Sequence, residues 1–253
     1  MNNKFAILTS SFNKYPYLND WMQSIIAQRY RPLEVVMVDD YSDDNTRKLI
    51  KRFRKRFDEN NISFNYIRNG YRLHCSSSYK KAIQNATGDF MGVLDADDML
   101  VEDAVEYIMK KYNEHEDIAW IYTQFDICGV DMKFIKQGFC RIPISWGSML
   151  DSGEKRKQVY SHWRTFSRRC NDLNNLLPEG LRCAVDKYMG YKLEEMGNGM
   201  FVNRVCYKYR QGVSRGIVAK ESTKVTWKKL VQSLVSNRKN NNIEPYPIIE
   251  GEI

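Results

Sequence analysis

The sequence predicts an α/β protein with a mostly parallel sheet and helices on both of its faces. Three observations support this prediction. Short apolar runs alternate with segments of helical periodicity over the first hundred residues. The runs are continuously apolar, as in strands that are buried on both faces. Polar residues follow directly after several runs, at the end of the strand where such folds bind ligands.

The first hundred residues contain the clearest elements. The expected strands cover residues 5–8, 33–38, 62–67 and 90–94, and the expected helices include residues 17–28 and 76–86. A further helix is expected between the second and third strands, where four apolar residues recur at helical spacing: Leu49, Ile50, Phe53 and Phe57. The same segment carries seven cations in ten residues: Arg47, Lys48, Lys51, Arg52, Arg54, Lys55 and Arg56. It is typical of an amphipathic helix with a solvated basic face. The alternative is attraction to an anionic membrane surface or a charged polymer.

The pattern changes after residue 98. A helix is expected over 101–112, a strand over 118–125 and irregular chain over 129–160. A helix-rich unit follows, with segments at 161–169 and 184–197, and then a strand over 201–210. From residue 212 the chain is basic, with an amphipathic helix expected over 225–235 and a flexible end over 240–253. We therefore expect a domain over 1–210, with halves 1–98 and 99–210, and a basic extension over 211–253.

Composition excludes several classes of protein. With 43% hydrophobic and 28% charged residues the chain is typical of a soluble globular protein. It has no apolar stretch long enough to cross a membrane, and its first residues lack the apolar core of a secretory signal. We expect a cytoplasmic protein. The basic tail suggests peripheral contact with a membrane, although such helices more often pack on their own domain.

The cysteine spacing and the distribution of charge argue against a zinc site and against a nucleic-acid-binding protein. The six cysteines show no C-x-x-C spacing, which argues against zinc and for free thiols. The net charge of +8 raises the alternative of a nucleic-acid-binding protein. Its aromatic residues do not interleave with the basic runs as single-strand binders require, so we expect no nucleic acid as a partner.

An acidic cluster ends the strand at 90–94. Asp95, Asp97 and Asp98 lie within four residues, and like charges about 4 Å apart repel by about 4 kcal/mol at an effective dielectric near 20. Asp98 is compatible with capping of the following helix, but Asp95 and Asp97 are not explained in this way. Two carboxylates at this spacing suit a hard divalent cation, which removes the repulsion.

Other polar residues share this position at the ends of strands. The carboxyl ends of parallel strands meet at one edge of the sheet. We therefore expect the residues that follow the strands to converge on one cleft with the acidic cluster. These residues are Thr9, Ser11, Asp39, Asp40 and Asp95.

Four segments carry a resemblance to a known family. They are TSSFNKYPYLNDWMQSIIAQ, LEVVMVDDYSDDNT, ATGDFMGVLDADD and AVDKYMGYKLEEMGNGMFVNRVCYKYR, and together they span about residues 5–210. In this order they resemble the family 2 glycosyltransferases, which have the GT-A fold. SHWRTF and AVDKYMGYKLEEMG also resemble segments of bacterial chondroitin and hyaluronan polymerases of that family.

The resemblance implies a reaction and its cofactor. The family transfers a sugar with inversion from a nucleotide-sugar, most often a UDP-sugar, to an acceptor hydroxyl, assisted by Mn²⁺ or Mg²⁺. The expected partners are therefore the donor and a glycan or lipid-linked acceptor. A cation would stabilise the charge that develops on the departing diphosphate.

The resemblance also assigns the metal site. It implies that Asp97 ligates the metal directly, and that Asp95 contacts the ribose, or the metal through water. His162 matches a histidine that helps to hold the metal in the polymerases. A lone histidine in such a segment is as often a structural hydrogen-bonding residue, so both interpretations stay open.

The nucleoside would be bound by Thr9, Ser11 and Asp39, with Asp39 accepting a hydrogen bond from the uracil imide. Asp40 fits a ribose contact or helix capping equally well. The family commonly has Arg-Asn before the strand that leads to the metal, but this chain has Tyr79-Lys80. Arg72 or Lys80 would then supply the missing positive charge.

Asp186 matches the catalytic base. The family usually has Glu-Asp there, and this chain has Val185-Asp186, so the acid that deprotonates the acceptor is kept. The alternative is a helix N-cap. Trp163, Tyr188 and Tyr191 are candidates for stacking on a sugar, and packing in the core explains each about as well.

Two further alternatives fit the sequence less well. A sugar nucleotidyltransferase needs a glycine-rich, basic phosphate loop after the first strand, and TSSFNKY does not provide one. A degenerate transferase that only binds sugars fits poorly with the presence of both Asp97 and Asp186. The donor sugar, the acceptor and the linkage have no signal in the sequence.

Overall fold

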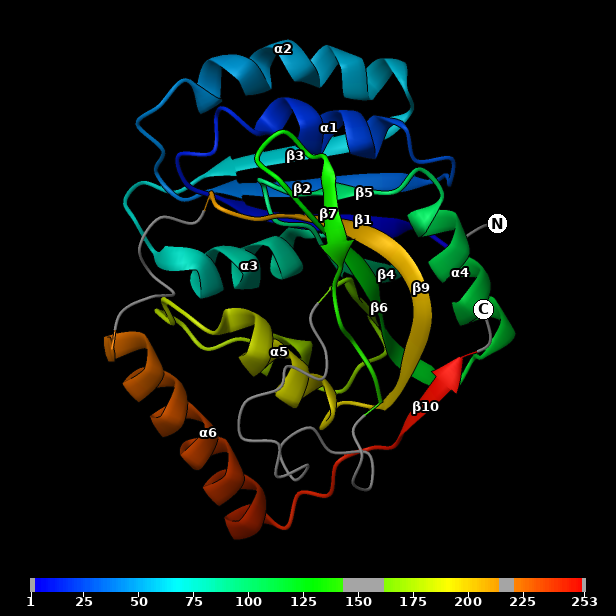
Figure 1. Cartoon of the computed structure of the whole chain (residues 1–253), viewed down its shortest axis with the longest axis vertical. Coiled ribbons are helices and arrows are strands. Elements are labelled where there is room, and N and C mark those ends of the chain that lie inside the picture. Colours follow the sequence, from blue (N-terminus) through cyan, green and yellow to red (C-terminus); the bar gives the residue numbers. More distant parts are fainter. Residues whose placement is uncertain (1–2, 143–161, 214–220, 252–253) are drawn as a thin grey trace.

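The computed structural model describes residues 3–142, 162–213 and 221–251. Its strands form one sheet in the order β10-β9-β6-β8-β4-β1-β2-β3, with β5 added to β9 and β7 added to β6 (Figure 1). They are β1 (Phe5–Ser11), β2 (Leu33–Asp39), β3 (Ile62–Arg68), β4 (Phe90–Val93), β5 (Met99–Leu100), β6 (Ile118–Cys128), β7 (Phe134–Gln137), β8 (Arg164–Ser167), β9 (Asn198–Arg210) and β10 (Ile248–Gly251).

Most neighbouring strands in this sheet are parallel. β1 pairs in parallel with β2 and β4, β2 with β3, and β9 with β6 and β10. β8 runs antiparallel between β4 and β6, and β5 and β7 are short antiparallel additions. The prediction of an α/β protein with a mostly parallel sheet is confirmed.

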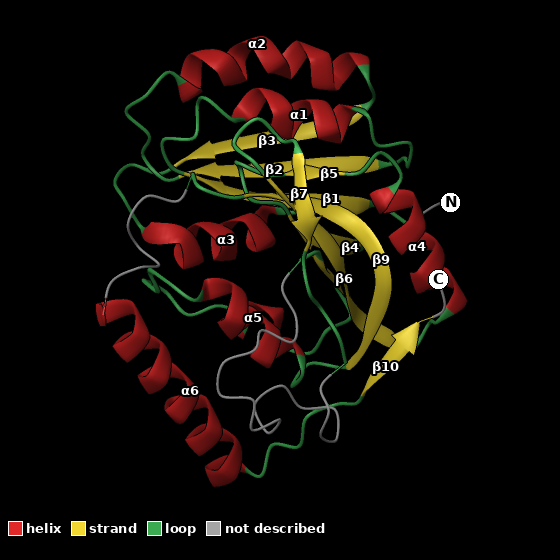
Figure 2. Ribbon diagram, viewed as in Figure 1, coloured by secondary structure: helices red, strands yellow, loops and turns green. Residues whose placement is uncertain are grey.

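Helices lie on both faces of the sheet. They are α1 (Leu18–Ile26), α2 (Thr46–Glu59), α3 (His74–Asn85), α4 (Ala104–Glu114), α5 (Val185–Leu193) and α6 (Glu221–Asn241), with a short 3₁₀ helix at Leu173–Asn175. α1 and α2 lie above β1, β2 and β3 in the view of Figure 2, and α3 lies below them. β1 and β2 are buried almost throughout between these layers, which explains their continuously apolar sequences.

α2 has the predicted amphipathic form. Ile50, Phe53 and Phe57 are buried, and the ring of Phe57 meets that of Trp21 edge-on at 6.3 Å. The cations of α2 lie on its outer side, exposed except for the half-buried Arg56. The interpretation of this segment as a solvated basic face is therefore confirmed.

Three expectations for the second half of the chain were wrong. Residues 164–167, expected in a helix-rich unit, form β8, whose four residues are all buried between β4 and β6. The region 129–160, expected to be irregular, contains the strand β7, and its residues 143–160 lie outside the described part. The expected flexible end contains β10, which pairs with β9.

An expectation for the C-terminal part is met. The helix expected over 225–235 is present as the longer α6. All six cysteines are free thiols. Within the described ranges, no helix combines the length and the apolar character needed to cross a bilayer.

Candidate functional site

The candidate site lies at the carboxyl ends of the central strands. The register of β1 and β2 places Ser11 beside Asp39, and the register of β1 and β4 places Leu8 beside Val93. The acid loop (residues 95–98) therefore starts next to the end of β1. The predicted convergence on this edge of the sheet is found for Ser11, Asp39 and the acid loop.

The acid loop is anchored from β9. Asp98 is 1% exposed and accepts hydrogen bonds from the Tyr207 hydroxyl and the Arg210 amide, both at 2.7 Å. The Arg210 guanidinium donates to the carbonyl of Asp97 at 2.7 Å and pairs with Asp20 at 2.7 Å. Asp98 is thus an internal anchor and not a helix cap, because Asp103 is the N-cap residue of α4.

The carboxylates of this loop are largely buried and repel one another. Burial raises the pKa of Asp95, and the charge of Asp97 raises it further against the lowering effect of Arg164. Burial, followed by the charges of Asp97 and Asp95, raises the pKa of Asp98 well above its usual range. A positive charge bound at the loop would oppose both effects.

Two neighbouring side chains bond to the outer carboxylates. Lys14, from the loop after β1, forms an ion pair with Asp97. The Tyr79 hydroxyl, from α3, donates to Asp95. Sequence reasoning missed Lys14, and it noted Tyr79 only as a departure from the family pattern.

His162 lies in an aromatic stack. Its ring is parallel to those of Tyr207 at 4.6 Å and Tyr209 at 5.4 Å, and it meets Phe125 edge-on at 5.2 Å. Burial, and then the charge of Arg164, lower the pKa of His162 well below its usual value. Its Nδ1 is buried and has no hydrogen-bond partner among the described residues. A neutral imidazole with an unused nitrogen is the form that ligates metals.

The residues fit a cation that is only partly held by the protein. Within residues 3–142, 162–213 and 221–251, no group of three or more His, Cys, Asp or Glu side chains is arranged to hold a metal ion. The expected ligands Asp95, Asp97 and His162 therefore do not form a closed three-ligand site. Mg²⁺ and similar cations are often bound by one or two carboxylates together with substrate phosphates. The acid loop suits that mode.

The nucleoside candidates are more deeply buried than expected. Asp39 has no exposed surface, and it accepts from the Ser42 amide at 2.9 Å and from the Tyr66 hydroxyl at 2.5 Å. Ser11 is 1% exposed, and its Oγ has no hydrogen-bond partner in the described part of the chain. Both carboxylate oxygens of Asp39 thus have partners within the protein, and the uracil contact stays a prediction.

Asp40 caps a helix. Its carboxylate accepts from the amides of Leu73 at 2.7 Å and His74 at 2.8 Å, which open α3, and from Asn69 at 3.0 Å. These amides have no partner inside the helix. Of the two interpretations of Asp40, the structure supports capping.

Two candidates belong to the core. Thr9 is fully buried, its hydroxyl donates to the carbonyl of Leu94 at 2.8 Å, and it accepts from the indole of Trp21 at 3.2 Å. Trp163 is also fully buried, with its ring 5.6 Å from that of Phe5. Neither side chain reaches solvent, so of the two interpretations of Trp163 the structure supports core packing, and it favours an internal role for Thr9 over a contact with the nucleoside.

The expected cations lie around the site without contacting the acid loop. The Arg72 guanidinium lies 3.9 Å from the ring centre of Phe12, in the loop after β1. The Lys80 ammonium is 3.4 Å from Glu179. Burial, and then the charges of Arg182 and Arg72, lower the pKa of His74. Arg182 is thus a further cation near the start of α3 that sequence reasoning missed.

Asp186 lies in the first turn of α5. The N-cap residue of this helix is Ala184, so Asp186 is not its cap. Burial and then four carboxylates, including Asp186 and those of the acid loop, raise the pKa of Tyr209 to about 12. The charge of Asp186 also acts on Asp95. Asp186 is therefore within electrostatic range of the acid loop.

The other aromatic candidates lie on the same helix. Tyr188 and Tyr191 are half-buried and pack against the core. Burial and then the charge of Glu195 raise the pKa of Tyr188, which stays a candidate for contact with an acceptor.

Arg164 is the cation at the centre of this arrangement. It is 3% exposed on β8, and its charge acts on both Asp95 and His162. The sequence marks Arg164 only weakly as a site residue, since an arginine in a segment such as RTFS is common on protein surfaces. Only the burial of β8 between two strands gives Arg164 its position.

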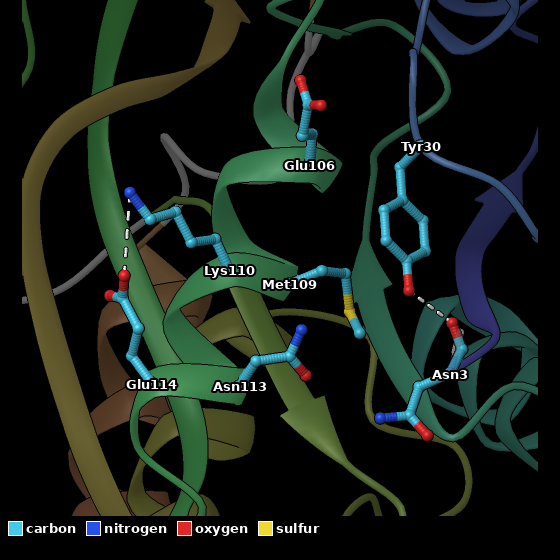
Figure 3. A pocket seen from close by; sticks show the side chains of 7 residues that line it. All are labelled: Asn3, Tyr30, Glu106, Met109, Lys110, Asn113 and Glu114. Carbon is cyan, nitrogen blue, oxygen red and sulfur yellow. Dashed lines mark hydrogen bonds and ion pairs between the residues drawn. The ribbon is translucent and has the colours of Figure 1, made fainter. Parts of the chain in front are cut away.

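A separate cavity of about 500 Å³ lies at the opposite end of the sheet. It is lined by residues before β1 and β2 and by the outer side of α4: Asn3, Tyr30, Glu106, Met109, Lys110, Asn113 and Glu114 (Figure 3). The Tyr30 hydroxyl donates to the carbonyl of Asn3 at 2.6 Å. None of the candidate site residues lines this cavity.

The chain resembles proteins whose solved structures have the same fold. It superposes on S. aureus TarS residues 1–349 in complex with UDP-GlcNAc with a TM-score of 0.72 and 18% identity, covering 92% of this chain and 67% of that one. The mannosyltransferase PcManGT from Pyrobaculum calidifontis, in complex with GDP-Man and Mn²⁺, gives 0.60 and 16%, covering 98% of this chain and 66% of that one. The fold is the expected GT-A fold.

Curated relatives are similar in sequence. A chondroitin synthase of Pasteurella multocida (strain Pm70) is 28% identical over 203 residues, which cover 80% of this chain and 20% of the relative. A chondroitin synthase of Escherichia coli is 27% identical over 210 residues, covering 80% of this chain and 28% of the relative. The chain thus spans only about a fifth to a quarter of the length of these relatives.

The family model described as glycosyl transferase family 2 matches residues 6–177. The match covers β1, β4 and the acid loop, and so most of the site described above. With the GT-A fold and the similarity to chondroitin synthases, it identifies this chain as a member of glycosyl transferase family 2.

Proposed function

We propose that this chain transfers a sugar from a UDP-sugar to an acceptor hydroxyl, with inversion and with the help of a divalent cation. The observation that carries the proposal is the position of Asp186, in electrostatic range of the acid loop at the carboxyl ends of β1 and β4. The acid loop suits a diphosphate and its cation. Asp186 offers a carboxylate to an acceptor.

Asp97 is the residue we assign to the cation. Its side chain is 12% exposed and forms an ion pair with the ammonium of Lys14, which supports a position that accepts positive charge. The neutral imidazole of His162 is the second candidate ligand. A bound Mn²⁺ or Mg²⁺ would neutralise the charge that develops on the leaving diphosphate.

Asp95 is the residue we assign to the ribose or to water on the cation. Its carboxylate is fixed by the Tyr79 hydroxyl and influenced by the buried Arg164. A carboxylate fixed in this way is preorganised, so little reorganisation is needed when a ligand arrives. Ser11, Asp39, Arg72 and Lys80 complete the proposed nucleotide site.

Asp186 is the residue we assign to base catalysis. It would take the proton from the acceptor hydroxyl as the oxygen attacks the anomeric carbon. The bond to the diphosphate breaks on the opposite side, so one displacement inverts the configuration. Asp186 lies in the first turn of α5.

Related proteins support a proposal for the donor and the acceptor. S. aureus TarS has been solved with UDP-GlcNAc, and several curated relatives are named as chondroitin or hyaluronan synthases. We therefore propose a UDP-sugar as donor and a glycan or a lipid-linked glycan as acceptor. Because the chain spans a small part of these relatives, the proposal concerns a single transfer step.

The variant Asp186→Asn tests the proposal. UDP release is measured with a panel of UDP-sugars, with p-nitrophenyl glycosides or water as acceptor, in the presence of Mn²⁺. We expect the rate at saturating donor to fall by about 10² to 10⁴, the usual contribution of a positioned base. UDP affinity should be unchanged. A variant that keeps more than about half of the rate would refute the assignment.

Asp97→Asn is the matched control, since it replaces another carboxylate by its amide. UDP binding by calorimetry should be strong with Mn²⁺ and nearly absent with EDTA in the unmodified chain. Asp97→Asn should remove the Mn²⁺-dependent part of binding, and Asp186→Asn should not. Equal binding in Mn²⁺ and EDTA would contradict the metal assignment.

A further inference from the structure

The C-terminal helix α6 contacts the helix that carries Asp186. Arg238, on α6, is 7% exposed, and its guanidinium donates to Glu195 at 2.8 Å and to Glu194 at 3.0 Å. Glu194 has no exposed surface, and the Glu195 side chain is 5% exposed. Buried charges of this kind need partners in fixed geometry, and Glu195 has a second ion pair, with Lys192.

The same guanidinium holds the end of α5. It donates to the carbonyl of Tyr191 at 2.7 Å, in the last turn of the helix, which ends at Leu193. Carbonyls in a last turn have no partner within the helix, and a cation there is favoured by the helix dipole. The chain after α6 adds a bond from the Tyr246 amide to the carbonyl of Glu194 at 2.7 Å. Residues 238–246 therefore fix the C-terminal end of α5.

α5 needs such support. It has nine residues, fewer than the roughly 12 to 15 that a helix needs to be even marginally stable alone. Its N-cap residue is Ala184, whose side chain has no atom that can accept from the first amides. The direction of α5 therefore depends on its packing against the core and on the contacts at its far end.

We propose that the C-terminal extension, acting through Arg238, sets the position of Asp186 for base catalysis. Arg238 is a positioning residue, and its role rests on the proposed function of Asp186. Asp186 lies about 10 Å along the helix axis from Leu193, at 1.5 Å per residue. A tilt of α5 by about 6° about its C-terminal end would move Asp186 by about 1 Å. A displacement of that size costs about 100-fold in rate where geometry is critical.

A double-mutant cycle between Arg238 and Asp186 tests the proposal. The rate of UDP release at saturating UDP-GlcNAc and Mn²⁺ is measured for the unmodified chain, Arg238→Met, Asp186→Asn and the double variant, with water as the acceptor. We expect Arg238→Met to lower the rate by about 10-fold or more with UDP affinity unchanged. In the Asp186→Asn background the same substitution should lower the rate by less than about twofold, because the group that Arg238 positions has been removed.

Lys239→Met is the matched control. Lys239 is the next residue on α6 and is exposed. Its substitution by Met removes one positive charge, as Arg238→Met does. The rate of UDP release by Lys239→Met should equal that of the unmodified chain. If Arg238→Met shows no cooperative melt, the cycle is run with Arg238→Lys, which keeps the charge but loses the planar fork that reaches three acceptors. Arg238→Lys should lie between the unmodified chain and Arg238→Met.

The outcomes separate this inference from the proposed function. If Asp186→Asn keeps the rate, the base assignment fails and the positioning role fails with it. If Asp186→Asn loses the rate and Arg238→Met does not, the positioning role alone is overturned. Equal losses from Arg238→Met in both backgrounds would also overturn it, since Arg238 would then support the fold in general and not Asp186.

Discussion

Lys14 places its ammonium group on the carboxylate of Asp97, and this ion pair joins the loop after β1 to the acid loop. The Lys14 side chain is 24% exposed and that of Asp97 is 12% exposed. The pair supplies positive charge to a loop in which the pKa values of Asp95 and Asp98 are raised. A cation that binds Asp97 would have to displace or share this contact.

Lys14→Met should therefore make the protein more dependent on a divalent cation. In EDTA we expect the melting temperature to fall by about 2 to 4 °C, as for a loss of about 1 kcal/mol in a chain of this size. Mn²⁺ should raise it by more in the variant than in the unmodified chain, because Lys14 no longer competes for Asp97. Thermal shift assays in EDTA and Mn²⁺ measure both effects.

Lys55→Met is the control for this prediction. Lys55 forms an exposed ion pair with Glu59 on α2 at 3.6 Å, and pairs of this kind contribute little to stability. Its melting temperature and its response to Mn²⁺ should match those of the unmodified chain. A Lys14→Met variant with the same Mn²⁺ response as Lys55→Met would show that Lys14 and the cation use different positions.

Asp40→Ala should destabilise the protein without removing nucleotide binding. The carboxylate satisfies two amides at the start of α3, and leaving such groups unsatisfied costs about 1 to 3 kcal/mol. Urea unfolding should show this loss, and UDP affinity by calorimetry should stay within about threefold. Asp58→Ala, at an exposed position on α2, should change stability by less than about 0.5 kcal/mol. Preserved stability with a large loss of UDP affinity would instead establish a ribose contact.

Thiols with raised pKa values should make stability fall in alkaline solution. Burial raises the pKa of Cys75, Cys170 and Cys206 from 9.0 to about 12. Between these values the unfolded chain loses thiol protons that the folded chain keeps, so rising pH favours unfolding. The three thiols together should lower the free energy of unfolding by about 4 kcal/mol between pH 8 and pH 10.

Urea unfolding at pH 8, 9 and 10 measures this trend. Cys170→Ala should remove about a third of it, because one of the three thiols is gone. Unfolding free energies that stay constant from pH 8 to pH 10 would mean that these thiols ionise in the folded protein.

Trp163 and Tyr188 should differ as acceptor contacts. Trp163→Phe leaves a space in the core beside Phe5 and should cost about 2 to 3 kcal/mol of stability, with the KM for the acceptor unchanged. Tyr188→Ala, at a half-buried position on α5, should raise the KM for the p-nitrophenyl glycoside. Initial rates over a range of acceptor concentrations separate the two. A raised KM in Trp163→Phe would restore Trp163 as an acceptor contact.

Local patterns were sufficient for the first half of the fold. A strand buried on both faces, such as β2, is a continuous apolar run that can be recognised without its neighbours. β8 was missed because Arg164, Thr165 and Ser167 are polar, and their burial follows only from pairing with β4 and β6. β10 was missed because its partner residues on β9 lie 49 residues earlier in the chain, as in the pairing of Ile248 with Gly199.

The site was predicted in outline, because its position at the ends of parallel strands is also marked by local patterns. The rule for the ends of parallel strands located Asp39 and the acid loop, but it does not distinguish a side chain in the cleft from one in the core. Thr9 was misplaced because its hydroxyl turns inward to Leu94. Lys14 was missed because its partner lies 83 residues away, and no local pattern marks such a pair.

The outer edge of β9 is covered in two halves, by β10 along Gly199–Val202 and by β5 at Tyr207 and Lys208. An uncovered strand edge is a template for pairing with another chain. A shortened version that ends before Ile248 would therefore expose the first half of this edge and invite aggregation. For anyone producing the protein, residues 248–251 belong in every expressed version, and a tag is better joined through a spacer than directly to β10.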